Sequence, residues 1–109
     1  MMNFNKCPYI YWSDITKISL LQRMVIIHSI LYYELDSSVI SDKKFDELSK
    51  QLVKMQRAAK EKLKETDYYY CMKDFDGSTG FDLYGRLKKK DKIRLTRYAQ
   101  HILRLSRKR

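Results

Sequence analysis

Aromatic rings and carboxylates gather around one short turn of this sequence, within the stretch LYYELDSSVISDKKFDEL. Rings can stack on a base and carboxylates can accept hydrogen bonds from a sugar, so the two types together suit a ligand that contains both. Two tyrosines close the helix before the turn, and the other members lie at the start of the next helix, where helical spacing brings them side by side. These candidate nucleotide-binding residues, called the hairpin set below, are Tyr32, Tyr33, Asp42, Phe45 and Asp46.

The same residues also suit an ordinary helix hairpin. Asp42 is an acid in the first turn of a helix, where it complements the helix dipole. Tyr32 and Phe45 stand at the spacing of core aromatics between packed helices. On the sequence alone, a nucleotide pocket and a purely structural hairpin both remain open.

Two helices must position the hairpin set. The first has Ser13 as its N-cap and runs to about Leu35, and because it is apolar on more than one face we expect it to be central or to face a partner as well. Residues 36–38 form the connection, and Ser41 with Asp42 caps the second helix. The predicted buried stripe of this second helix consists of Phe45, Leu48, Leu52, Met55, Ala59 and Leu63.

The rest of the chain predicts shorter elements. The aromatic residues 66–75 predict a short strand or extended segment, which the YIYW segment near the N-terminus could pair with. DFDGSTGFDL predicts a turn that leads into a short helix over residues 79–87. A last helix over residues 92–106 is apolar through Leu95, Tyr98, Ala99, Ile102 and Leu105. The fold class is therefore mainly α: a helix hairpin (13–66), an aromatic segment, turn and short helix (67–90) and a basic C-terminal helix and tail (91–109), in a single small domain.

The formal net charge of +10 belongs entirely to the C-terminal segment. Residues 1–85 hold twelve basic and twelve acidic residues, whereas residues 86–109 hold eleven basic residues and only Asp91. A localised positive field attracts a polyanion, either a nucleic-acid backbone or an acidic protein surface. The simpler interpretation is that these charges form a solvated helix face with a frayed tail and bind no partner. The candidate residues, called the basic row below, are Lys88, Lys89, Lys90, Arg94, Arg97, His101, Arg104, Arg107 and Lys108.

Other classes of function find little support. At 109 residues the chain is too short for a catalytic architecture with a separate cofactor domain. Cys7 and Cys71 lack CxxC spacing and no secretory signal is recognisable, so we expect a cytoplasmic protein. The longest charge-free run, residues 24–33, is too short to span a bilayer. His28 within it is interpreted as a satisfied core histidine, and neither histidine has the spacing of a metal ligand.

The hairpin resembles the N-terminal Ia subdomain of bacterial NAD-dependent DNA ligases, whose motifs stand here as LYYELD, VISD and KKFDEL within residues 18–55. In that family the hairpin clamps the nicotinamide mononucleotide (NMN) half of NAD, so the resemblance implies NAD or NMN as a ligand of the hairpin set. Phe45 replaces the tyrosine of the family and keeps a ring without its hydroxyl. Tyr33 stands where the family often has histidine.

The resemblance does not extend to ligase catalysis. Adenylation needs the lysine of a KxDG motif within a nucleotidyltransferase domain, and KDFDG at residues 73–77 is one residue too long. Small standalone proteins of phages and other mobile elements also resemble the Ia subdomain, and DFDGSTGFDL looks like their sequences. This likeness implies a non-catalytic binding role with nucleic-acid or host targets.

Three hypotheses follow for a chain that we expect to have no catalytic residue and no metal. The first is a non-catalytic Ia-like module that contacts nucleic-acid backbone through the basic row. The alternative is a phage or mobile-element inhibitor, of the anti-CRISPR type for example, that binds an acidic surface of a host nuclease or replication protein. The third is an NAD or NMN sensor. None of the three involves a membrane.

Overall fold

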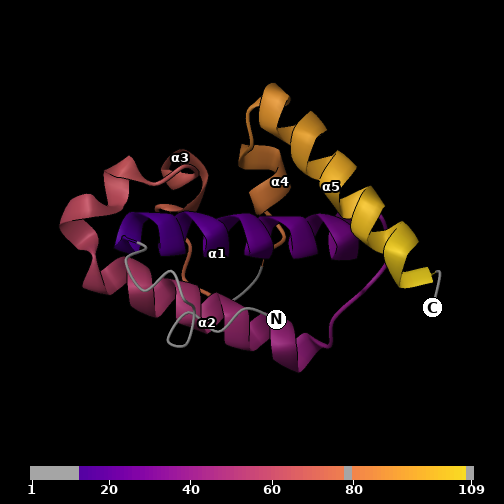
Figure 1. Cartoon of the computed structure of the whole chain (residues 1–109), viewed down its shortest axis with the longest axis horizontal. Helices are drawn as coiled ribbons and strands as arrows, with labels where there is room; N and C mark the ends of the chain where they lie inside the picture. The colour runs from indigo at the N-terminus through magenta and orange to yellow at the C-terminus, as the bar shows by residue number, and fades with distance from the viewer. Residues whose placement is uncertain (1–12, 78–79, 108–109) are drawn as a thin grey trace.

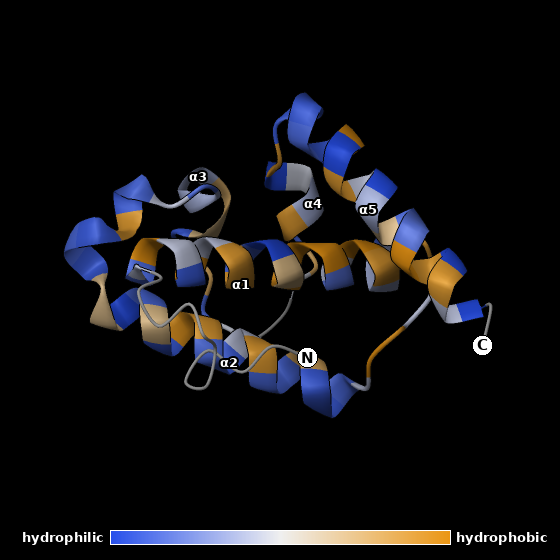
Figure 2. Cartoon of the chain, in the orientation of Figure 1, coloured by the Kyte–Doolittle hydropathy of each residue, from blue (hydrophilic) through white to orange (hydrophobic). Residues whose placement is uncertain are grey.

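A central helix, α1 (Asp14–Ser29), organises the computed structural model, which describes residues 13–77 and 80–107. It contacts α2, α4 and α5, and Figure 1 shows α2 along one side of α1 and α5 crossing the other. Figure 2 shows apolar residues along much of α1, whereas α2 and α5 alternate apolar and hydrophilic residues. The expectation of a central helix is thereby confirmed, since Ile18, Val25 and Ile26 are all buried on it.

The hairpin forms where the N-caps predict it. The Ser13 side chain accepts a hydrogen bond from the Thr16 amide at 3.2 Å, and Ser41 accepts one from the Lys44 amide at 3.1 Å. The chain leaves the first helix at Asp36, whose φ of 48° is left-handed, a conformation that Asp tolerates better than most residues. Helix α2 (Asp42–Ala58) then runs back along α1 and continues into the 3-10 helix η2 (Lys60–Glu65).

Helix α1 ends in one turn of π-helix, η1 (Ile30–Glu34), closed by a hydrogen bond from the Leu35 amide to the Ile30 carbonyl at 3.0 Å. A π turn is wider than an α turn, is rare, and frequently occurs at functional sites. Here it carries both tyrosines of the hairpin set.

The aromatic residues 66–75 do not form the predicted strand. They form turns and a short helix, α3 (Tyr69–Met72), and the described residues contain no strand. The reason lies in α1, where buried Gln22 accepts a hydrogen bond from the Tyr68 amide at 3.1 Å and Ser19 accepts one from the Asp67 amide at 3.0 Å. These side chains satisfy backbone groups that would otherwise need a neighbouring strand. The YIYW segment lies outside the described residues.

The C-terminal helices differ from the prediction in their bounds. The short helix α4 covers Leu83–Arg86, and α5 covers Lys89–Arg107, so it starts before the predicted residue 92. The Lys92 amide donates to the Lys88 carbonyl at 2.9 Å, so the first turn of α5 already includes residues 89–91. Asp91 in this turn accepts hydrogen bonds from the Tyr70 hydroxyl at 2.5 Å and from Arg94 at 3.2 Å. The mainly α fold class is confirmed. In the part of the chain that the structure describes, no helix is long and apolar enough to cross a membrane.

Candidate functional site

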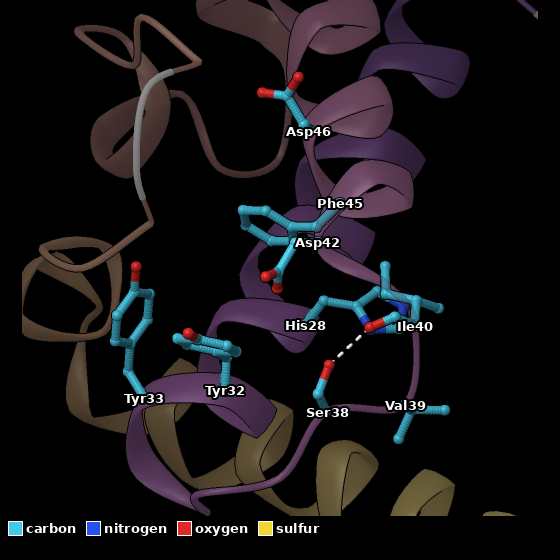
Figure 3. A pocket seen from close by; sticks show the side chains of 9 residues that line it. All are labelled: His28, Tyr32, Tyr33, Ser38, Val39, Ile40, Asp42, Phe45 and Asp46. Atoms are coloured by element: carbon cyan, nitrogen blue, oxygen red, sulfur yellow. Dashed lines mark hydrogen bonds between the residues drawn. The ribbon is translucent and has the colours of Figure 1, made fainter.

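A pocket of about 330 Å³ opens between the end of α1, the connection and the start of α2. All five members of the hairpin set line it, and Figure 3 shows their side chains around one opening. The structure therefore brings together side chains that the sequence analysis grouped by spacing. The complete lining, called the hairpin pocket, is His28, Tyr32, Tyr33, Ser38, Val39, Ile40, Asp42, Phe45 and Asp46.

The rings of the pocket are available for stacking. Tyr32 is 49% exposed and meets Tyr33 edge to face with ring centroids 4.8 Å apart. The interpretation of Tyr32 as a core aromatic is therefore wrong: it lies in the π turn with about half of its surface open to solvent. Phe45 is half-buried against the core. Tyr33 also packs edge-on against Phe81, at 5.5 Å between centroids.

The two carboxylates give the pocket a negative side. Asp42 lies exposed in the first turn of α2, where the helix dipole favours its charge. Asp46, one turn further along, forms an ion pair with Lys50 at 2.9 Å, and its side chain is still 52% exposed. Both acids remain open to a ligand that enters the pocket.

His28 is a pocket residue that the sequence analysis assigned to the core. Its ring is only partly buried, it borders the pocket, and its Nδ1 is buried with no hydrogen-bond partner among the described residues. It is therefore not the satisfied core histidine we expected. Burial lowers the pKa of His28 and favours the neutral ring. The spacing of four residues to Tyr32 was the signal that could have placed it in the pocket.

Gly80 supports one wall of the pocket. A Cβ at this position would overlap the Ser29 Oγ and lie 3.3 Å from the Phe45 ring. The backbone after residues 78–79, which lie outside the described structure, thus packs directly between α1 and α2. This close approach holds Phe81 against Tyr33. Gly80 and Phe81, which the sequence placed in a turn, therefore also pack against the hairpin helices.

The basic row lies exposed on and just before α5, except for Lys108, which falls outside the described residues. The apolar face of α5 differs from the prediction: Leu95 and Ala99 are buried, but Tyr98 is 47% exposed and Leu105 is 52% exposed. Helix α5 packs against both α1 and η1, and these two side chains lie on its solvent-exposed side. The outer surface of α5 is therefore basic with apolar side chains between the charges.

A polar network fixes the start of α5. Arg94 donates hydrogen bonds to the Tyr68 hydroxyl at 2.7 Å and to Asp91. The Tyr70 hydroxyl donates to Asp91 and accepts from the Lys88 amide at 3.2 Å. Burial, together with the hydrogen bond to Asp91, raises the pKa of Tyr70 to about 12, so this hydroxyl stays protonated and remains a donor.

No family model, curated protein or solved structure matches this chain. Within residues 13–77 and 80–107, no group of three or more His, Cys, Asp or Glu side chains is arranged to hold a metal ion. Burial raises the pKa of the Cys71 thiol to about 11, and its Sγ donates to the Leu83 carbonyl at 3.4 Å, so this thiol is a poor nucleophile.

Proposed function

We propose that this chain is a non-catalytic binding module that contacts nucleic-acid backbone through the basic row. One observation carries the proposal: between residues 86 and 107 every exposed side chain that carries a formal charge at neutral pH is a lysine or an arginine. The single acid of that span, Asp91, is buried against Tyr70 and Arg94. A surface with cations and without exposed carboxylates attracts a polyanion at low ionic strength.

The spacing along α5 also supports a backbone contact. Arg97, His101 and Arg104 recur at intervals of four and three residues, so they share one side of the helix. Arg97 and Arg104 lie about 10 Å apart along the axis, at 1.5 Å per residue. Successive phosphates of one DNA strand rise by about 3.4 Å, so this side of α5 spans roughly three of them.

Fluorescence anisotropy with labelled duplex and single-stranded oligonucleotides tests the proposal. Affinity should fall as salt rises, with a logarithmic slope near −3 for duplex if about three phosphates are neutralised. Arg97→Gln with Arg104→Gln should reduce both the affinity and the slope. Lys54→Gln with Lys60→Gln removes the same charge from exposed positions outside α5 and is the matched control. Absence of binding to either oligonucleotide at low salt would overturn the proposal.

A protein partner is the competing outcome of the same experiment. The exposed apolar side chains of α5 would also suit an acidic protein surface such as that of a host nuclease. Pull-down from a host lysate before and after nuclease treatment separates the two. A partner that is retained after nuclease treatment, combined with no oligonucleotide binding, favours the inhibitor hypothesis.

A second candidate function is nucleotide binding in the hairpin pocket. The observation that favours it is the convergence of all five members of the hairpin set on one pocket. The nicotinamide ring of NAD or NMN is a cationic aromatic ring, which suits exposed tyrosine rings beside carboxylates. The resemblance to the ligase Ia subdomain makes these two molecules the first to test.

Calorimetric titration with NAD and NMN tests this second function. Asp46→Ala should weaken binding, although part of its effect arises from releasing Lys50. Asp42→Asn removes a charge from an acid that has no ion pair in the described structure, so it is the cleaner variant. Phe45→Tyr restores the hydroxyl found in the ligase family and should strengthen binding. No heat with either molecule at millimolar concentration would exclude this function.

A further inference from the structure

The outer side of α5 carries a shallow groove of about 530 Å³ that combines cations with two exposed apolar side chains. Tyr98 and Ile93 are 47% and 48% exposed at this groove. A charged surface that only followed phosphates would need neither of them. The lining, called the α5 groove, is Lys90, Ile93, Arg94, Arg97, Tyr98 and His101.

Tyr98 is held in place from the side of α1. The guanidinium of Arg23 lies 5.9 Å from the centroid of the Tyr98 ring, in a cation–π arrangement. This contact orients the ring, and about half of its surface remains open to solvent. An oriented, exposed ring loses less conformational freedom when a flat ligand stacks on it.

Side chains that can donate hydrogen bonds to phosphates lie within one helical turn of this ring in both directions. Arg94 precedes Tyr98 by four residues, and His101 follows it by three. Arg94 is already fixed by Asp91 and the Tyr68 hydroxyl, yet its side chain is 54% exposed. Arg97 is exposed and forms no ion pair in the part of the chain that the structure describes. The groove thus offers a ring flanked by groups that can bind phosphates.

We propose that the α5 groove binds single-stranded nucleic acid in preference to duplex, with one base stacked on Tyr98 and the neighbouring phosphates on Arg97 and Arg94. This inference rests on the proposed backbone contact and names its substrate. A positively charged groove with an aromatic platform is the usual design for sequence-independent single-strand binding. In a duplex the bases already stack on one another, so no base face is available to Tyr98.

Three probes of equal length separate stacking from charge: an oligothymidine of about ten nucleotides, an abasic strand with the same phosphates, and a duplex. Anisotropy at low salt should give the tightest binding for oligothymidine. Tyr98→Ala should weaken oligothymidine binding by about 5- to 150-fold, the range for loss of one stacked base. The same variant should leave abasic and duplex binding unchanged.

Matched variants keep the test specific. Leu105→Ala truncates another exposed apolar side chain of α5 outside the groove and should not change oligothymidine affinity. Tyr98→Trp keeps a ring and should retain affinity, whereas Tyr98→Leu keeps apolar bulk without a π face and should behave like Tyr98→Ala. Thermal unfolding of each variant identifies any that fail to fold. If Tyr98→Ala does not fold, the difference in oligothymidine affinity between Tyr98→Trp and Tyr98→Leu still shows whether a ring is needed.

Each contrary result has a defined meaning. No binding of any probe overturns the proposed backbone contact and this inference with it. Equal binding of duplex and oligothymidine, with no effect of Tyr98→Ala, overturns only the single-strand preference. Full affinity in Tyr98→Leu overturns the stacking. Competition by polyglutamate as strong as that by oligothymidine also overturns the inference, because it indicates a surface that recognises acidic protein rather than bases.

Discussion

The hairpin pocket and the basic row differ in how many elements build them. The pocket takes its rings and acids from the end of α1, the connection and α2, and Gly80 supports its wall. The basic row lies on α5 and the residues just before it. A pocket made by several elements depends on their packing, whereas a charged helix face depends mainly on the helix being formed and exposed.

The two surfaces should therefore respond to different perturbations. Salt weakens contacts between exposed charges and a polyanion, and it has less effect on stacking in a concave site. Small changes of volume in tightly packed regions alter the pocket and leave the outer face of α5 intact. Variants that affect only one surface can show whether the two are independent.

The largest expected effect comes from charge reversal on α5. Arg97→Glu with Arg104→Glu replaces two exposed cations by anions, so oligonucleotide affinity at low salt should fall by more than about 100-fold. Anisotropy measures this loss. Calorimetry with NMN should show an unchanged pocket if the two surfaces are independent. A loss of NMN binding in the same variant would show that they are coupled.

Of the two surfaces, Gly80→Ala should alter the pocket and leave the outer face of α5 unchanged. The added Cβ would overlap Ser29 and press on Phe45, so we expect a loss of about 1–3 kcal/mol in the free energy of unfolding. NMN binding should weaken with it, while oligonucleotide affinity is retained. Denaturant unfolding and the two binding assays check these outcomes.

Gly85 provides the matched control for that substitution. A Cβ at Gly85 meets nothing within 4 Å, and the residue lies in helix α4. Gly85→Ala should therefore raise stability slightly, by up to about 1 kcal/mol. Equal destabilisation by both substitutions would contradict the role assigned to Gly80.

The parts of this fold that depend on local sequence could be predicted. The serine caps at Ser13 and Ser41 mark the starts of both hairpin helices, since a cap and its amide are three residues apart. The hairpin set was found from helical spacing around one short connection. Such signals lie within a few residues of the feature they specify.

The parts that depend on distant contacts could not be predicted. Gln22 bonds the Gln56 side chain at 2.9 Å and the Thr66 hydroxyl at 3.0 Å, and with Ser19 it holds residues 66–68 as a turn rather than a strand. Gly80 reaches Ser29 and Phe45 across a similarly large separation in sequence. Propensity favoured a strand in the aromatic segment, and tertiary hydrogen bonds overrode it.

Asp91→Asn tests whether the attachment of α5 to the body matters for its binding surface. The amide loses the charge-assisted hydrogen bonds to Tyr70 and Arg94, so stability should fall by about 1–2 kcal/mol. Asp91 is the only acidic residue between residues 86 and 109, so removing its charge should not reduce oligonucleotide affinity. Thermal unfolding and anisotropy measure the two effects. Parallel losses of both would mean that the network orients the basic row as well as stabilising α5.

The smallest expected effect compares the two histidines, since the pocket contains His28 and α5 carries His101. Burial lowers the pKa of His28 below 6.5, so the unfolded chain binds its proton at a higher pH than the folded chain does. The contribution of His28 to stability is therefore complete above pH 6.5 and declines as the pH falls toward the lowered pKa. Solvent around the partly exposed ring keeps the effect small.

The sensitivity to acid should consequently depend on which histidine is replaced. His28→Gln should flatten the loss of stability on the acid side, whereas His101→Gln should retain it. Asp42 and Asp46 line the same pocket and stay in both variants, so the difference isolates the ring of His28. Urea unfolding between pH 7.5 and pH 5 measures the slope in each, below the one-proton limit of about 1.4 kcal/mol per pH unit. An identical slope in both variants would mean that His28 has the same pKa in the pocket as in the unfolded chain. Burial in the pocket would then not distinguish His28 from His101.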